Sequence, residues 1–215
     1  MAGFSDNGRP VVVFVHGLWM TGLELAWLRR QVSKAGFEAR QFFYPTVRRS
    51  LAHNAEALFN FAHELDAREV HFIGYSLGGI VTLSMLSQFD NELPPGRVVL
   101  IGSPVCGSDA ARRMAKHRWG RMVLGGAGTD CLVENHVHRW RGERELGVIA
   151  GTRSVGLGKF FGRLPSPNDG TVAVDETRLE NESDRIELPL THATLMFSRK
   201  VAEGAVGFFR SGRFA

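Results

Sequence analysis

The chain has 215 residues, of which 44% are hydrophobic and 22% charged, and both values are ordinary for a globular protein with one sizeable core. The net charge of +4 comes from 26 basic and 22 acidic residues, which are largely interleaved along the chain. Interleaved charges do not indicate the basic patch that a nucleic-acid-binding surface needs. We therefore expect one domain over residues 1–215 and no nucleic acid as a partner.

The cysteines and the apolar runs exclude several further classes of protein. Cys106 and Cys131 are too few for a disulfide framework and are not spaced as a metal site, although one disulfide between them stays open as an alternative to two thiols. The polar start of the chain and the short run Val11–Val15 do not resemble an export signal, and no stretch approaches the length of a membrane span. We expect a cytoplasmic protein without stable membrane insertion.

Strand-like and helix-like runs alternate along the chain, which predicts an α/β fold with an open, mostly parallel sheet and helices on both faces. Residues 103–145 are the least regular part. In chain order, we predict strands at Val11–Val15, Glu38–Tyr44, Val70–Ile73, Arg97–Ile101, Leu146–Ala150 and Arg185–Leu188, and helices at 22–35, 51–65, 80–86, 109–118 and 193–209.

The segment Gly74-Tyr75-Ser76-Leu77-Gly78 lies between a predicted strand and a predicted helix. A strand that turns sharply into a helix holds its turn residue in a strained backbone conformation, and glycines two positions away on either side avoid a clash. The serine hydroxyl then projects from the sheet edge at the positive end of the helix. This arrangement predicts that Ser76 attacks an acyl carbon. The alternative is a glycine-rich turn in which the serine only caps a helix.

A serine hydroxyl needs a base to remove its proton, and in this arrangement an acid and then a histidine follow the serine in the chain. His192 is the best candidate, because it lies between the last predicted strand and the last predicted helix, at the edge of the sheet where catalytic groups gather. We expect His117, His136 and His138, in the arginine-rich irregular region, to be solvated surface residues.

The acid that would orient His192 is less clear from position alone. Asp169 follows the turn segment Pro165-Ser166-Pro167-Asn168 on a loop that leaves the carboxyl end of a predicted strand. Asp175 is the second candidate and Glu176 the third. An ordinary turn aspartate that binds local backbone amides is an equally good interpretation of Asp169 at this point.

Two amide donors are needed for the oxyanion that forms when a serine attacks an ester. The Leu77 N–H group follows the nucleophile and is the first expected donor. We expect the second donor from the loop after the first strand, where Gly17 lets the backbone curl towards the serine and places the Leu18 N–H group, with Trp19 as its neighbour. His16 is interpreted as a structural residue that holds this loop in place.

Taken together, these segments resemble the α/β-hydrolase superfamily, in particular small bacterial lipases and esterases. The resemblance covers residues 11 to about 210. Its D-G-x-V-like segment implies Asp169 rather than Asp175 as the acid, whereas Thr191 stands where the family usually has a glycine before the histidine. The matching segments are Val15-His16-Gly17-Leu18, Gly74-Tyr75-Ser76-Leu77-Gly78-Gly79, Gly102-Ser103-Pro104, Asn168-Asp169-Gly170-Thr171-Val172 and His192.

The resemblance implies hydrolysis of carboxylic esters, with a small-molecule or lipid ester as substrate, no metal or organic cofactor, and little or no lid. An acyltransferase or a thioesterase would use the same residues, and a non-catalytic binding module is a further alternative. The sequence leaves the oligomeric state and the role of residues 103–145 open.

One basic segment and one aromatic loop bear on how a substrate is approached. We expect a solvated helix face, followed by a loop whose phenylalanines pack into the core. The alternative is that both border the mouth of the site and favour anionic or membrane-derived esters through weak surface binding. The residues concerned are Arg112, Arg113, Lys116, Arg118 and Arg121, and the loop 157–163 with Phe160 and Phe161.

Overall fold

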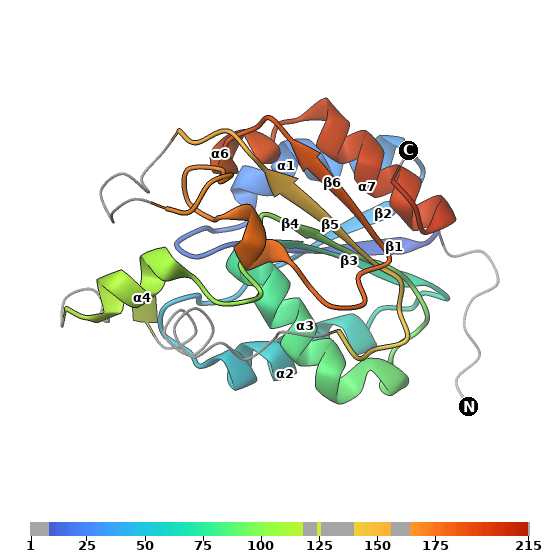
Figure 1. Cartoon of the computed structure of the whole chain (residues 1–215). Helices are drawn as coiled ribbons and strands as arrows, with labels where there is room; N and C mark the ends of the chain where they lie inside the picture. Colours follow the sequence, from blue (N-terminus) through green and yellow to red (C-terminus); the bar gives the residue numbers. More distant parts are fainter. Residues whose placement is uncertain (1–8, 118–123, 126–139, 156–163, 215) are drawn as a thin grey trace.

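The computed structural model describes residues 9–117, 124–125, 140–155 and 164–214 (Figure 1). Six strands form one sheet in the order β2-β1-β3-β4-β5-β6, and all neighbouring pairs are parallel. The predicted parallel sheet is therefore confirmed, with strand ends within two residues of those expected. The strands are β1 (Val11–Val15), β2 (Glu38–Phe42), β3 (Val70–Tyr75), β4 (Val98–Ile101), β5 (Leu146–Gly151) and β6 (Asp184–Leu188).

Helices cover both faces of this sheet, as the strand-helix alternation predicts (Figure 1). The helices α1 (Ala26–Lys34) and α7 (Arg199–Ser211) lie on one face, and α2 (Leu51–His63) and α3 (Leu77–Phe89) lie on the other. All residues of β1, β3, β4 and β5 are buried, because side chains of a strand alternate between the two helical layers. The shorter elements are η1 (Leu23–Leu25), η2 (Asp90–Glu92), α4 (Asp109–Ala115), η4 (Val174–Thr177) and α6 (His192–Leu195).

The prediction of one continuous C-terminal helix over 193–209 is wrong. The structure divides this segment into α6 and α7, with Ser198 between them in an extended conformation (φ −87°, ψ 125°). The Ser198 side chain accepts a hydrogen bond from Val201 N, so it caps the second helix instead of continuing the first. The break keeps α6 short and leaves His192 at its first position, at the edge of the sheet.

No helix in the described ranges is long and apolar enough to cross a membrane. The predicted helix 109–118 is present as α4, where Arg112 pairs with Asp109 at 2.5 Å and Arg113 is exposed. This part of the expected solvated helix face is confirmed. Several residues of the sequence analysis lie outside the described residues, namely Arg118, Arg121, Cys131, His136, His138 and the loop 157–163.

Candidate active site

Ser76 occupies the turn between β3 and α3 in a strained backbone conformation, with φ 53° and ψ −124°. Few residues other than glycine adopt a positive φ, and such residues persist where the surrounding structure holds them firmly. Here the Ser76 N–H group donates to the Ile101 carbonyl at 2.9 Å, which ties the turn to the end of β4. The side chain of Ser76 is partly exposed at this edge of the sheet.

The glycines around Ser76 are required by close approaches of the backbone. A Cβ atom on Gly74 would lie 2.4 Å from Cα of Gly79, and one on Gly78 would lie 2.1 Å from the Val15 carbonyl oxygen. Both distances are far below van der Waals contact, so a side chain at either position would force the helix away from the sheet. The spacing of glycines that draws attention in the sequence thus has a steric cause.

Asp169 and the first residue of α6, His192, form a close pair at the same edge of the sheet. The Asp169 Oδ2 atom lies 2.6 Å from His192 Nδ1, and His192 N–H donates to the Asp169 carbonyl at 2.9 Å. The second carboxylate oxygen, Oδ1, accepts from the amides of Thr171 at 2.9 Å and Val172 at 2.7 Å. In a neutral imidazole, Nδ1 carries the proton and donates it in a hydrogen bond to the carboxylate, so Nε2 of His192 keeps its lone pair and can act as a base.

Two contacts hold this imidazole against the residues that adjoin Ser76. The Tyr75 hydroxyl donates to the His192 carbonyl at 2.9 Å, and the two rings lie 5.0 Å apart. On the other side, a Cβ atom on Gly102 would lie 3.1 Å from His192 Nδ1. Gly102 directly follows Ile101, whose carbonyl binds the Ser76 amide. Asp169 and His192 are therefore in contact with each other, and His192 lies against Tyr75 and Gly102 at the carboxyl edge of the sheet, close to the Ser76 turn.

The sequence analysis missed the contribution of Tyr75. Burial, and then the charge of Asp169, raise the pKa of the Tyr75 hydroxyl above its ordinary value, so the group stays protonated and remains a donor. The sequence carries no signal for this contact beyond the position of Tyr75 next to Ser76, because its partner is 117 residues away.

The loop after β1 lies directly against the Ser76 turn. A Cβ atom on Gly17 would lie 3.1 Å from the Ser76 Cβ atom, so only glycine lets the two segments approach this closely. The Trp19 amide donates to Thr46 Oγ1 at 3.2 Å and is thereby occupied. The amides of Leu18 and Leu77, in contrast, make no hydrogen bond to any residue that the structure describes. These are the two amides expected at an oxyanion site.

His16 is buried, and its contacts are with Gly17 and Tyr44. Its ring stacks on Tyr44 with centroids 4.5 Å apart, and its Nδ1 atom lies 3.0 Å from the Gly17 carbonyl. The Tyr44 hydroxyl donates to the His16 carbonyl at 2.7 Å. Burial lowers the pKa of His16 below its ordinary value, so the ring is neutral. These contacts are those of a residue that fixes the loop, as we expect from the sequence.

The alternative acids lie away from His192 and have other partners. The side chain of Asp175 is 77% exposed and pairs with Arg178 at 3.2 Å. Glu176 is buried, and its carboxylate accepts from the amides of Asp109 at 2.6 Å and Ala173 at 2.9 Å. Burial raises the pKa of Glu176, and the carboxylate serves to join the start of α4 to η4. Neither residue is hydrogen-bonded to His192.

Thr191 replaces the glycine that the resemblance leads one to expect before the histidine, and the structure provides a reason. Its side chain accepts from the Thr194 amide at 3.3 Å, while the Thr194 hydroxyl accepts from the Thr191 amide at 2.9 Å. This reciprocal capping box starts α6 at His192. The departure from the family pattern is thus compatible with a well-held histidine.

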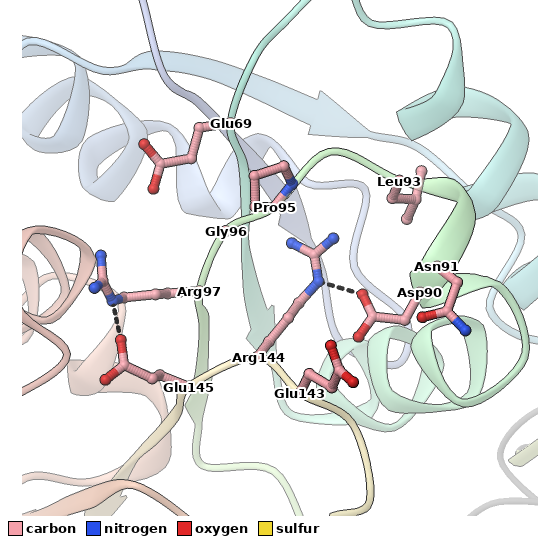
Figure 2. A pocket seen from close by; sticks show the side chains of 10 residues that line it. All are labelled: Glu69, Asp90, Asn91, Leu93, Pro95, Gly96, Arg97, Glu143, Arg144 and Glu145. Carbon is pink, nitrogen blue, oxygen red and sulfur yellow. Dashed lines mark hydrogen bonds and ion pairs between the residues drawn. The ribbon is translucent and has the colours of Figure 1, made fainter.

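A hollow of about 510 Å³ lies at the opposite edge of the sheet and does not belong to this site (Figure 2). Three of its lining residues, Glu69, Arg97 and Glu145, directly precede β3, β4 and β5. Its two arginines are engaged, since Arg97 pairs with Glu145 at 2.5 Å and Arg144 pairs with Asp90. The hollow is thus lined by ion pairs that join the strand starts to neighbouring loops.

Solved structures of several enzymes share this fold. The lipase BlEst2 of Bacillus licheniformis in its mature form aligns with a TM-score of 0.76 and 22% identity, over 96% of this chain and 93% of that chain. The RedJ thioesterase of the prodiginine pathway of Streptomyces coelicolor aligns with a TM-score of 0.64 and 12% identity, over 97% and 90%. The metagenomic carboxyl esterase MGS0156 aligns with a TM-score of 0.62 and 16% identity, over 88% and 66%.

No curated protein sequence matches the chain. At these identities the structural neighbours establish the fold, which is that of lipases and esterases. A family model described as "Alpha/beta hydrolase family" matches residues 12–200, which include all but the first residue of β1, and Ser76, Asp169 and His192. The sheet order, the strained turn after β3 and this match agree, and the chain belongs to the alpha/beta hydrolase family.

Proposed function

We propose that this chain is a single-domain serine hydrolase that cleaves carboxylic esters through an acyl-enzyme on Ser76. The observation that carries the proposal is the 2.6 Å contact between Asp169 and His192, held beside the strained Ser76 turn. A serine hydroxyl is activated as a nucleophile when it lies beside a histidine whose Nδ1 atom is hydrogen-bonded to an aspartate. The lipase and esterase among the structural neighbours favour an ester over other acyl substrates.

In the first half of the reaction, His192 Nε2 takes the proton of the Ser76 hydroxyl while Oγ attacks the ester carbonyl carbon. The carbonyl oxygen becomes an oxyanion and accepts hydrogen bonds from the amides of Leu18 and Leu77. Each such donor is worth about 3 kcal/mol of barrier. The imidazolium then donates its proton to the alkoxy oxygen of the ester. The bond between this oxygen and the carbonyl carbon breaks, the alcohol departs, and the acyl group stays on Ser76.

In the second half, His192 takes a proton from water as the water oxygen attacks the acyl carbon. The same two amides hold the oxyanion again, and the proton returns to Ser76 Oγ as the carboxylic acid departs. The Asp169 carboxylate stays ionised throughout and stabilises the imidazolium in each half. Every atom that moves in this cycle is supplied by the ester, by water or by Ser76 and His192, so the reaction needs no metal or organic cofactor.

A fluorophosphonate probe with mass spectrometry, together with hydrolysis of p-nitrophenyl esters, tests this proposal. Ser76→Ala should fold normally, lose probe labelling and lose essentially all hydrolysis, because no other group replaces the nucleophile. Ser87→Ala removes an exposed hydroxyl from the same helix and is the matched control, which should keep both. Undiminished hydrolysis by Ser76→Ala would refute the proposal. Product analysis with added alcohols, and with thioesters, separates a hydrolase from a transferase or thioesterase.

A further inference from the structure

The described residues expose five large hydrophobic side chains, and all of them lie on segments that leave the carboxyl ends of the strands. Each is more than half exposed. They are Trp19 and Leu23 after β1, Phe43 directly after β2, Val155 after β5, and Phe197 after β6 and α6. We call these five residues the apolar rim. Large apolar side chains that gather on one part of a surface mark an interaction site more often than scattered ones do.

The order of the strands places the apolar rim on both sides of Ser76. Parallel strands end at a common edge, and β3, which carries the Ser76 turn, lies between β1 and β4 in the sheet. Phe43, Trp19 and Leu23 therefore flank the site from the side of β2 and β1. Val155 and Phe197 flank it from the side of β5 and β6. A flat partner that contacts both flanks would cover the mouth of the site.

The backbone of Trp19 supports a role for its exposed side chain. Trp19 has φ 59°, one of three positive values among the non-glycine residues that the structure describes, and its side chain is 53% exposed. A bulky residue in this region carries a conformational cost, and the Trp19 amide is held in place by Thr46. The fold thus holds Trp19, next to Leu18, in a costly backbone conformation while half of its side chain stays exposed.

The charged residues near the apolar rim indicate which kind of partner surface the rim would bind. Four exposed cations have no ion-pair partner among the described residues: Arg48 and Arg49 after Phe43, Arg153 before Val155, and Lys200 after Phe197. Two acids lie on the same segments: Glu203 pairs with Arg199, whereas the Glu24 carboxylate accepts from the amides of Thr21 and Gly22 and keeps its charge, so the cations are in excess. Apolar side chains interspersed with uncompensated cations match a layer with apolar chains and anionic headgroups.

We propose that the apolar rim docks this edge of the molecule on an anionic lipid layer, with the Ser76 site facing the layer. Trp19, Phe43 and Phe197 enter the boundary between headgroups and acyl chains, while the cations contact the headgroups. The inference rests on the proposed function for what the docked protein would cleave, namely esters that reside in such a layer. The docking itself depends only on the rim and the cations.

Co-sedimentation of the whole chain with vesicles tests the docking. We expect binding to phosphatidylglycerol vesicles and about ten-fold weaker binding to phosphatidylcholine vesicles, with the difference shrinking as salt rises to roughly 0.15 M and beyond. Phe43→Ser combined with Phe197→Ser should weaken binding to phosphatidylglycerol by about ten-fold or more. Arg48→Gln combined with Arg49→Gln and Arg153→Gln should weaken binding several-fold and flatten its salt dependence.

A charge-matched control uses two exposed arginines away from this edge, Arg30 on α1 and Arg141 before β5. Arg30→Gln combined with Arg141→Gln should leave vesicle binding unchanged. Equal binding by the wild type and both rim variants would overturn the proposal, as would negligible binding to either lipid. A dimer in sedimentation velocity that dissociates on Phe43→Ser with Phe197→Ser would assign the rim to a second copy of the chain and would also overturn it.

Activity separates this inference from the proposed function. The Phe43→Ser, Phe197→Ser variant should hydrolyse a dissolved p-nitrophenyl ester at the wild-type rate, because both side chains are more than half exposed and the proposed reaction uses neither of them. Ser76→Ala should still bind vesicles. Hydrolysis without vesicle binding by the wild type refutes only the docking, and vesicle binding without hydrolysis refutes only the proposed function.

Discussion

The two edges of the sheet each carry a histidine beside a carboxylate, and the two pairs differ in nearly every other respect. At the carboxyl edge, Asp169 lies 2.6 Å from Nδ1 of His192, whose side chain is 15% exposed. At the amino edge, Glu69 lies 3.3 Å from Nε2 of His71, whose side chain is 1% exposed. A short distance between a histidine and an acid is therefore not what identifies a candidate catalytic pair.

The difference lies in which ring nitrogen keeps a lone pair, and where that nitrogen points. His71 Nδ1 accepts the Arg97 amide at 2.9 Å, so the proton of the neutral ring sits on Nε2 and no basic nitrogen is left over. His71 is enclosed between Phe37 and Phe209, with ring centroids 5.6 Å and 4.6 Å away. In His192, Nδ1–H donates a hydrogen bond to the Asp169 carboxylate, and Nε2 remains available as a base at a partly exposed edge.

The largest effect on turnover is expected from exchanging the Asp169 carboxylate for an amide, and the same exchange at Glu69 serves as the comparison. Asp169→Asn should lower kcat by about 10³–10⁴-fold with little change in melting temperature, because an amide favours the wrong tautomer and cannot stabilise the imidazolium. Glu69→Gln should leave kcat unchanged, and Asp175→Asn should be mild. Steady-state hydrolysis of a p-nitrophenyl ester by the three purified variants measures this. A larger loss in Asp175→Asn than in Asp169→Asn would move the acid to position 175.

An intermediate effect is expected from Tyr75→Phe, which keeps the ring beside His192 and removes only the hydroxyl. Loss of one hydrogen bond to the His192 carbonyl corresponds to about 1 kcal/mol, or roughly a five- to ten-fold decrease in kcat. Since Tyr75 would position His192 without touching substrate, kcat should fall while KM does not change. A higher KM with an unchanged kcat would contradict a positioning role.

The smallest effect on turnover is expected at His71, where stability should respond instead. Burial, and then the charges of Arg97 and Arg144, lower the pKa of His71 from 6.5 to about 3. Between these values the unfolded chain binds a proton that the folded chain does not, so stability should fall as the pH falls from 6.5 towards 3. This one group contributes a slope of about 1.4 kcal/mol per pH unit.

His71→Gln tests this by removing the titration. Urea unfolding at several pH values should give a lower stability at neutral pH but a shallower fall on acidification than in the wild type, and ester hydrolysis at neutral pH should persist. An unchanged slope would show that other groups cause the acid sensitivity. If the variant folds but loses turnover, His71 contributes to catalysis as His192 is proposed to do, and the contrast between a structural and a catalytic histidine is wrong.

The sequence by itself determines the features that depend on near neighbours in the chain. Buried strands can be recognised because the four central ones consist mostly of apolar residues, and the Ser76 turn can be recognised because its glycines lie two positions away on either side. The order of serine, acid and histidine also follows from the chain. The break at Ser198 also has a local cause, although the helical periodicity over 193–209 does not reveal it. The Ser198 side chain caps α7, and this competes with continuing the helix through Ser198.

Only the tertiary structure decides what distant segments do together. Position alone leaves Asp169 and Asp175 as alternatives, and the family resemblance favours Asp169, but the contact that distinguishes them spans 23 residues. The hydrogen bond from Tyr75 to His192 and the gathering of Trp19, Phe43 and Phe197 at one edge depend likewise on the strand order. Periodicity shows that a residue faces the core or the solvent, whereas its neighbours across the sheet are set by how the strands associate.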